Sequence, residues 1–140
     1  MNVKLYFLSA ISALGLASSA FAADTKVGFI YVGPINDGGW TQIHHENALV
    51  MKEYFGDKID MVYQENVAEG ADSERVMTQM ALTGADLIFT TSYGFMDPTI
   101  NVAQKFPDVK FEHATGFKRS DNVSTYSARF YEGRAIQGHI

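Results

Sequence analysis

The residues with the clearest chemical potential lie in one short loop, Gly33–Trp40, which reads GPINDGGW. Asp37 supplies a carboxylate, which accepts hydrogen bonds from hydroxyl or ring N–H groups. Trp40, the only tryptophan of the chain, supplies a flat apolar face for stacking. The pair favours an uncharged, planar ligand rich in donors, because a ligand without those donors would leave the carboxylate unpaired.

Two other interpretations of this loop stay open at the level of sequence. A phosphate-binding loop needs G-x-G-x-x-G or G-x-x-x-x-G-K-[ST], and Gly39-Trp40 stand where the Lys-Ser/Thr pair belongs. Asp37 would also repel a phosphate at the start of a helix. A purely structural turn and helix cap, with Trp40 packed as a core aromatic, fits the residue types as well. Residue chemistry alone does not separate the cap from the ligand site.

The loop belongs to a repeating pattern of strand and then helix. Such alternation predicts an α/β fold with a doubly wound parallel sheet and right-handed crossovers. In a sheet of this kind the ligand lies beyond the carboxyl ends of the strands, where the strand order switches. Apolar, β-rich runs predict the strands at residues 26–32, 59–63, 86–92 and 109–115, with a further strand at 122–127.

The period of the apolar residues predicts which helix faces are buried. In the helix between Trp40 and Gly56 the expected inner stripe is Ile43, Val50, Met51 and Tyr54. In the helix that ends at Gly84 it is Val76, Met77, Met80 and Ala81.

Composition excludes several classes of protein. The net charge of −5 argues against nucleic acid or an anionic membrane as the main partner. There is no cysteine, so disulfides, thiolate nucleophiles and thiolate metal sites are excluded. His44 and His45 are adjacent and lack the i,i+4 spacing of a helical metal pair. Glu65 and Glu69 lack the order of a calcium loop and are interpreted as solvated. We therefore expect neither a metal nor a cofactor, and no enzyme.

Residues 1–22 have the pattern of a secretory signal peptide. Lys4 precedes an apolar run rich in small residues, and Ala20-Phe21-Ala22 fits the small-x-small cleavage pattern. A membrane-spanning helix is the weaker interpretation, because the apolar run is short and rich in serine. Cleavage after Ala22 would leave residues 23–140 as one domain, exported to the periplasm without a lipid-anchor cysteine.

Several stretches together resemble the basic membrane protein family, the purine nucleoside receptor-like substrate-binding proteins of ABC importers. They are VGPINDGGW, ENVAEGADSERV, GADLIFTTSYGFMDP, FPDVKFEHATG and NVSTYSARFYEGR. The likeness extends over essentially the whole chain after the leader. It implies a two-lobed type I periplasmic binding protein fold, of which residues 23–140 form the N-terminal lobe, incomplete at its C-terminus. The last segment, which is helix-like and has no clear stop before Ile140, agrees with that expectation.

The resemblance implies a monomeric solute-binding component that captures a purine nucleoside, a nucleobase or a similar heterocycle in the periplasm. It would deliver the solute to an ABC permease of the inner membrane. Asp37 and Trp40 match the aspartate and aromatic with which relatives hold their ligand, and Thr41 falls where a relative has asparagine. Gly38-Gly39 replace bulkier residues of the nucleoside receptors, so a nucleobase remains a candidate ligand beside a nucleoside.

The loop after the third expected strand adds further candidates. Asp97 corresponds to a second ligand-binding aspartate of the family, although Asp97-Pro98 also has the pattern of a helix cap. Tyr93 and Phe95 lie in the same loop and would add an aromatic wall. Two other functions remain as alternatives on the same fold: an exported enzyme of the nucleoside hydrolase type, and a sensory ligand-binding module.

Overall fold

The computed structural model describes residues 23–139. Its strands form a five-stranded parallel sheet in the order β2-β1-β3-β4-β5. The strands are β1 (Thr25–Ile30), β2 (Ile59–Gln64), β3 (Leu87–Thr90), β4 (Lys110–Ala114) and β5 (Val123–Tyr126). The predicted α/β fold with a doubly wound parallel sheet is confirmed.

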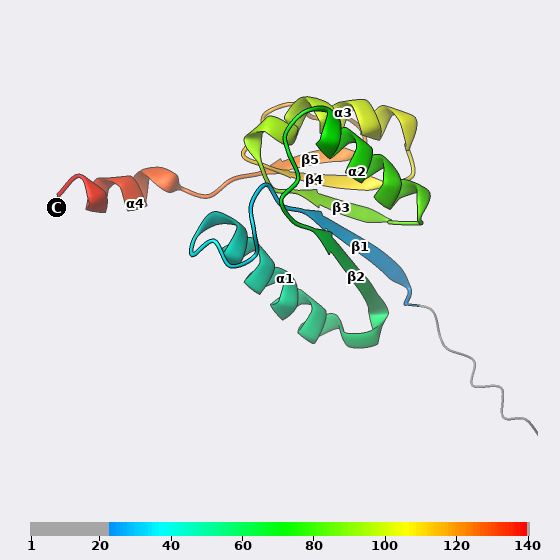
Figure 1. Cartoon of the computed structure of the whole chain (residues 1–140), viewed down its shortest axis with the longest axis horizontal. Helices are drawn as coiled ribbons and strands as arrows, with labels where there is room; N and C mark the ends of the chain where they lie inside the picture. Colours follow the sequence, from blue (N-terminus) through cyan, green and yellow to red (C-terminus); the bar gives the residue numbers. More distant parts are fainter. Residues whose placement is uncertain (1–22, 140) are drawn as a thin grey trace, which may run out of the picture.

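The helices lie on both faces of the sheet (Figure 1). Helix α1 (Trp40–Phe55) covers one face, while α2 (Ala71–Leu82) and α3 (Met96–Lys105) cover the other. Short 3-10 turns lie at Gly56–Lys58 and Tyr93–Phe95. Helix α4 (Phe130–Gln137) follows β5, projects away from the body and buries none of its residues. No helix within residues 23–139 has the length and apolar character needed to cross a membrane.

The strand order switches at β1. The chain passes from β1 to its neighbour β2 and then returns to pair β3 on the other side of β1. Beyond the ends of the two strands, the backbone N–H of Thr91 still donates to the carbonyl of Ile30 at 3.3 Å. The loops that follow β1 and β3 therefore leave the sheet side by side, which is where open α/β sheets bind ligands.

The larger part of the core lies between the sheet and helices α2 and α3. Side chains from these helices pack on Ile30, Ile88 and Phe111 of the strands. The stripe predicted for α2 is confirmed, because all of its residues are buried: Val76, Met77, Met80 and Ala81. The side chains of Val76, Met77 and Met80 each contribute about 1.5–3 kcal/mol when fully removed from water.

The stripe predicted for α1 is largely wrong. Ile43, Val50 and Tyr54 are 52%, 63% and 82% exposed. The buried residues of α1 are Thr41 and Ala48, and Ala48 packs with β1 and β2 side chains. The helix therefore rests on the β1–β2 half of its sheet face through small residues. Its apolar stripe is not covered by the described part of the chain.

A polar cluster lies inside the α3 side of the core. The Thr90 hydroxyl lies 2.7 Å from Nδ1 of His113, and the Thr99 hydroxyl lies 3.1 Å from that of Thr90. His113 is buried, and its Nε2 has no hydrogen-bond partner within residues 23–139. The ring fills the space beside Gly116, where any Cβ would overlap it. An imidazole in such a place is stable only when it is neutral.

The buried histidine predicts that the lobe loses stability in mild acid. Burial lowers the pKa of His113 below 6.5, although the hydrogen bond with Thr90 raises it. Below about pH 6.5 the unfolded chain therefore takes up a proton that the folded chain refuses, and the free energy of unfolding falls. Urea unfolding at about pH 8 and about pH 5 measures the loss. His113→Gln should flatten this dependence, and an unchanged slope would contradict the assignment.

Candidate functional site

Four loops meet at the carboxyl edge of the sheet, after β1, β2, β3 and β4. The first two are joined by backbone hydrogen bonds, from Val67 N–H to the Tyr31 carbonyl at 2.9 Å and from Asn66 N–H to the Gly33 carbonyl at 3.3 Å. The loop after β3 is joined to β1 by the Thr91 hydroxyl, which donates to the Ile30 carbonyl at 2.8 Å. The loops thus form one connected platform over the switch point.

Asp37 points back toward the start of α1. Its carboxylate accepts backbone N–H bonds from Gly39 (2.8 Å), Thr41 (2.8 Å) and Gln42 (3.0 Å). These bonds, led by those from Gln42 and Thr41, lower the pKa of Asp37 from 3.8 to about 2. The side chain is exposed and stays ionised throughout the neutral range. Asp37 therefore caps the helix, as the structural interpretation of this loop expects.

Trp40 is a half-buried residue that bridges two loops, and it is not part of the core. Its indole N–H donates to the Thr91 carbonyl at 2.6 Å, which ties α1 to the loop after β3. His44 packs against the indole with ring centroids 4.6 Å apart, and Phe130 lies 5.8 Å away. Because the polar group of the indole is already used, Trp40 can offer a ligand only its ring surface.

A cavity of about 320 Å³ opens beside this indole. It lies at the ends of β4 and β5, and its walls include Thr115, Tyr126 and Phe130. Its volume is at the lower end of the range for small-molecule sites. Sequence analysis did not identify Tyr126, whose ring lines this cavity because β5 occupies the edge of the sheet.

Thr41 lies directly behind the loop. The residue is fully buried, and its hydroxyl has no hydrogen-bond partner within the described chain. Gly33 passes so close that a Cβ there would stand 3.1 Å from the Thr41 hydroxyl oxygen. Thr41 therefore supports the loop from the interior, and this position explains why a glycine precedes the turn.

The two aromatic candidates after β3 have opposite environments. Tyr93 is 56% exposed and stands at the carboxyl edge. Phe95 is 0% exposed and packs in the core below that edge. The structure therefore places Tyr93 on the surface that a ligand can reach. It buries Phe95 in the core beneath that surface.

Asp97 lies in the first turn of α3 and makes no cap hydrogen bond. Its exposed carboxylate accepts a 2.6 Å hydrogen bond from Lys118, in the loop after β4. This ion pair links the first turn of α3 to the loop after β4, and an exposed pair of this kind contributes little to stability.

Two glutamates that sequence reasoning interpreted as solvated have defined partners here. Glu65 accepts the backbone N–H of Ile35 at 2.8 Å and so holds the loop after β1. Glu69 accepts the Ser92 hydroxyl at 2.6 Å, and its carboxylate rests on Gly94, where a Cβ would overlap it. Glu65 follows β2 directly and Glu69 lies in the same loop, and their place behind a strand end was the signal that could have identified them.

The arrangement is suited to holding an uncharged molecule. It offers an ionised carboxylate, a fixed indole, an exposed tyrosine and backbone groups, all beyond the ends of parallel strands. Within residues 23–139 no three His, Asp or Glu side chains are grouped closely enough to hold a metal ion.

Comparison with known proteins gives consistent results. The chain is 54% identical over 134 residues to the purine-binding protein of Brucella abortus, covering 95% of this chain and 38% of that protein. It is 39% identical over 110 residues to a putative ABC transporter glucose-binding protein of Haloferax volcanii, covering 79% of this chain and 28% of that one. A solute-binding protein of an Aeropyrum pernix ABC transporter system superposes with a TM-score of 0.69 at 25% identity, over 81% of this chain and 31% of that structure.

The chain thus spans less than two fifths of the length of these relatives. The likeness to a solved solute-binding protein confirms the expected fold. Residues 24–140 match the family described as ABC transporter substrate-binding protein PnrA-like. Because that match covers nearly the whole chain, the protein belongs to the PnrA-like family of ABC transporter substrate-binding proteins.

Proposed function

We propose that this lobe helps to capture a purine, as a nucleobase or a nucleoside, for import through an ABC permease. The observation that carries the proposal is the fixed indole of Trp40, which is tied to Thr91 and faces a cavity of about 320 Å³ at the ends of the strands. The name of the Brucella relative, which is 54% identical, supports the ligand class. A purine ring stacks on an indole and offers donors to a carboxylate.

The candidate residues take different roles in this proposal. Trp40 stacks on the ring. The Asp37 carboxylate already accepts three backbone hydrogen bonds, and its remaining lone pairs accept a hydrogen bond from the ligand. Tyr93 forms part of the wall, and Asp97 stands at the rim with Lys118. The two buried candidates, Thr41 and Phe95, hold these loops in place from within.

The remaining parts of the proposal concern the whole protein. The substrate-binding proteins of ABC transporters work outside the cytoplasmic membrane, and we place this one in the periplasm after cleavage near Ala22. Residues 1–22 lie outside the described residues. The complete protein would act as a monomer that closes on its solute and presents it to the permease.

A sugar is the second candidate ligand. The Haloferax relative is named as a putative glucose-binding protein, and Asp37 would accept sugar hydroxyls as readily as ring N–H groups. Trp40 would then pack against the apolar face of the sugar ring. The two ligand classes differ in the signal that they produce, because only a purine ring shifts a neighbouring indole resonance through its aromatic current.

The test uses the single indole as its reporter. The lone Trp40 gives one indole N–H resonance, which we follow by NMR while adding adenine, adenosine or guanosine to the chain. We expect a graded shift with weak affinity, because one lobe covers only one side of a ligand. Trp40→Phe removes the reporter, so 19F-labelled tyrosine at Tyr93 serves as the second probe.

Glucose and uridine are the controls for ligand class. Saturable shifts with purines alone support the proposal, and shifts with glucose alone support the sugar. If the purines and glucose all leave both probes unmoved at their solubility limits, the loops after β1 and β3 are not the ligand platform.

A further inference from the structure

We infer that His44 is a ligand-binding residue of the cavity beside Trp40, where the Nε2 atom of its imidazole accepts a hydrogen bond from the bound solute. This role rests on the proposed function and adds to it a residue that selects ligands by their donors. Sequence reasoning rejected His44 and His45 as a metal pair and gave His44 no role at the site.

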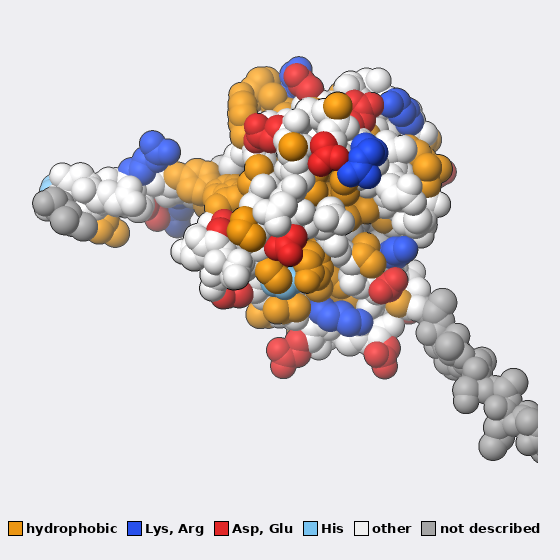
Figure 2. All heavy atoms as spheres, viewed as in Figure 1, with side chains coloured by type: hydrophobic (Ala, Val, Ile, Leu, Met, Phe, Trp, Pro, Cys, Tyr) orange, Lys and Arg blue, Asp and Glu red, His pale blue; other side chains and the backbone are white. Residues whose placement is uncertain are grey.

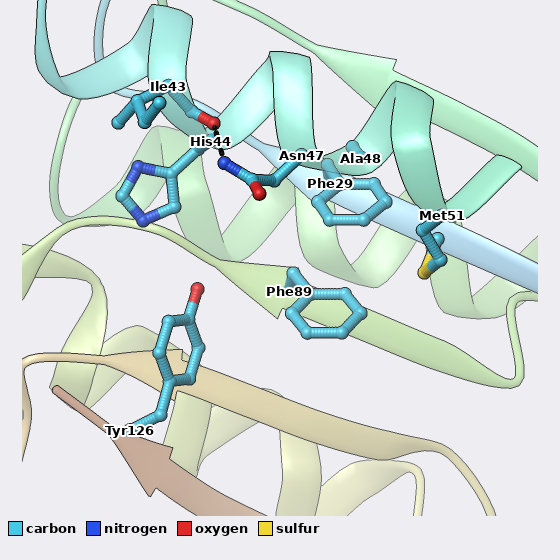
Figure 3. Close-up of a pocket in the computed structure, with 8 residues that line it drawn as sticks. All are labelled: Phe29, Ile43, His44, Asn47, Ala48, Met51, Phe89 and Tyr126. Atoms are coloured by element: carbon cyan, nitrogen blue, oxygen red, sulfur yellow. Dashed lines mark hydrogen bonds between the residues drawn. The ribbon is translucent and has the colours of Figure 1, made fainter. Parts of the chain in front are cut away.

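The imidazole of His44 forms part of the wall of that cavity. The ring packs against the Trp40 indole with centroids 4.6 Å apart, and Tyr126 and Phe130 belong to the same wall. Figure 3 shows the imidazole on the side of α1 that faces the sheet, with the hydroxyl of Tyr126 pointing toward the helix. A solute that stacks on Trp40 in this cavity therefore lies within reach of His44.

A hydrogen bond within α1 decides which nitrogen of His44 is available. Nδ1 lies 2.7 Å from the carbonyl oxygen of Trp40, one helical turn earlier. Because a carbonyl oxygen can only accept, Nδ1 carries the proton of the neutral ring and acts as the donor. Nε2 then keeps a free lone pair and is an acceptor. The side chain of His44 makes no other hydrogen bond within residues 23–139.

The surroundings make this acceptor selective. Much of the cavity wall is apolar: Ile43, Ala114, Ala128 and Phe130. Hydrophobic side chains also gather where the chain leaves the body toward α4 (Figure 2). In such surroundings a ligand without a matching donor leaves the lone pair of Nε2 unpaired, which costs affinity. Burial raises the pKa of Tyr126 to about 12, so its hydroxyl stays protonated and can donate to the same ligand.

The adjacent His45 has a different environment. Its Nδ1 lies 3.4 Å from the Tyr31 hydroxyl, and its ring packs on Tyr63 with centroids 4.7 Å apart. It is not part of the wall of the cavity beside Trp40. Neighbouring side chains on a helix point about 100° apart, so the two histidines meet different partners. His45 is therefore the matched control for His44.

The test compares a purine that can donate with one that cannot. Adenine carries N–H groups, whereas 9-methylpurine has the same ring system without a donor. His44→Phe keeps an aromatic ring beside Trp40 and removes both nitrogens. His44→Asn keeps a donor for the helix carbonyl, as Asn47 does toward Ile43 at 2.7 Å. The Trp40 indole resonance reports both ligands in the wild-type chain, these two variants and His45→Phe, and thermal melts check that each is folded.

We expect the preference for adenine over 9-methylpurine to fall by about five-fold or more in both His44 variants and to stay unchanged in His45→Phe. An equal loss of affinity for both ligands would reduce His44 to a support of Trp40 and overturn the inference, as would an unchanged preference. A wild-type chain that responds to neither purine would refute the proposed function, and the role of His44 with it.

Long-range 1H–15N spectra of the wild-type chain at about pH 8 give a second measurement, which does not depend on the folding of a variant. In the free chain, Nδ1 of His44 should carry the proton and Nε2 should not. Adenine should move the Nε2 resonance much more than 9-methylpurine does. A proton on Nε2 in the free chain would overturn the inference, even where purines bind.

Discussion

Phe95→Ala should destabilise the lobe by about 3–5 kcal/mol, the usual loss for a fully buried phenylalanine. Phe95 is 0% exposed and packs in the core cluster with residues of α2, α3 and the strands. A loss of this size is a large share of the 5–15 kcal/mol by which domains are stable, so the urea concentration at the midpoint of unfolding should fall clearly. Urea unfolding followed by circular dichroism measures it.

Two neighbouring variants make this result specific. Phe95→Leu keeps most of the volume and should lose less than about 1.5 kcal/mol. Tyr93→Ala removes an exposed ring and should change stability by no more than about 0.5 kcal/mol, while weakening the response to purines. A stable Phe95→Ala variant with impaired ligand response would assign Phe95 to the ligand, against its buried position.

Asp37→Ala should affect both the fold and the proposed site. The substitution leaves three backbone N–H groups at the start of α1 without their acceptor, so we expect the melting temperature to fall by several degrees. The purine response should weaken by about ten-fold or more, because the ligand donor loses an ionised acceptor. Thermal melts and the NMR titration of the Trp40 indole measure the two effects on one sample.

Asp37→Asn separates charge from capping, because asparagine caps helices as well as aspartate does. The pKa of Asp37 is about 2 in the folded chain and 3.8 without its partners, so its contribution to stability is present above pH 3.8 and is lost as the pH falls toward 2. The Asp37→Asn variant should lack this pH-dependent contribution to stability, because its side chain does not titrate. Asp97→Ala is the control, since its exposed pair with Lys118 should matter little. Equal falls in melting temperature for Asp37→Ala and Asp97→Ala would contradict the capping role of Asp37.

The order of the elements was predictable because it depends on local signals. Glycine and proline mark the ends of the helices, and runs of β-branched and aromatic residues mark the strands. The inner stripe of α2 was also predictable, since its period points at a sheet that the same chain supplies. The same period in α1 misled, because an apolar stripe does not show whether the described part of the chain covers it.

The site was only partly visible in the sequence. Asp37 and Trp40 were identified from their types and their place after a strand, and both lie at the switch point. Their partners were not foreseeable. The Thr91 carbonyl that fixes the indole is 51 residues away along the chain, and Ser92 is 23 residues from Glu69. Phe95 and Tyr93 stand two positions apart and resemble each other as side chains, yet one is buried and the other exposed.

The sequence by itself determined the parallel α/β sheet, the edge at which we expect a ligand and the chemical character of the loop after β1. Tertiary structure decided which carboxylates hold loops together, which aromatic reaches the surface and which apolar face stays open. The physical reason is that local patterns select secondary structure, whereas the direction and burial of a side chain depend on strands and loops that only folding brings into contact.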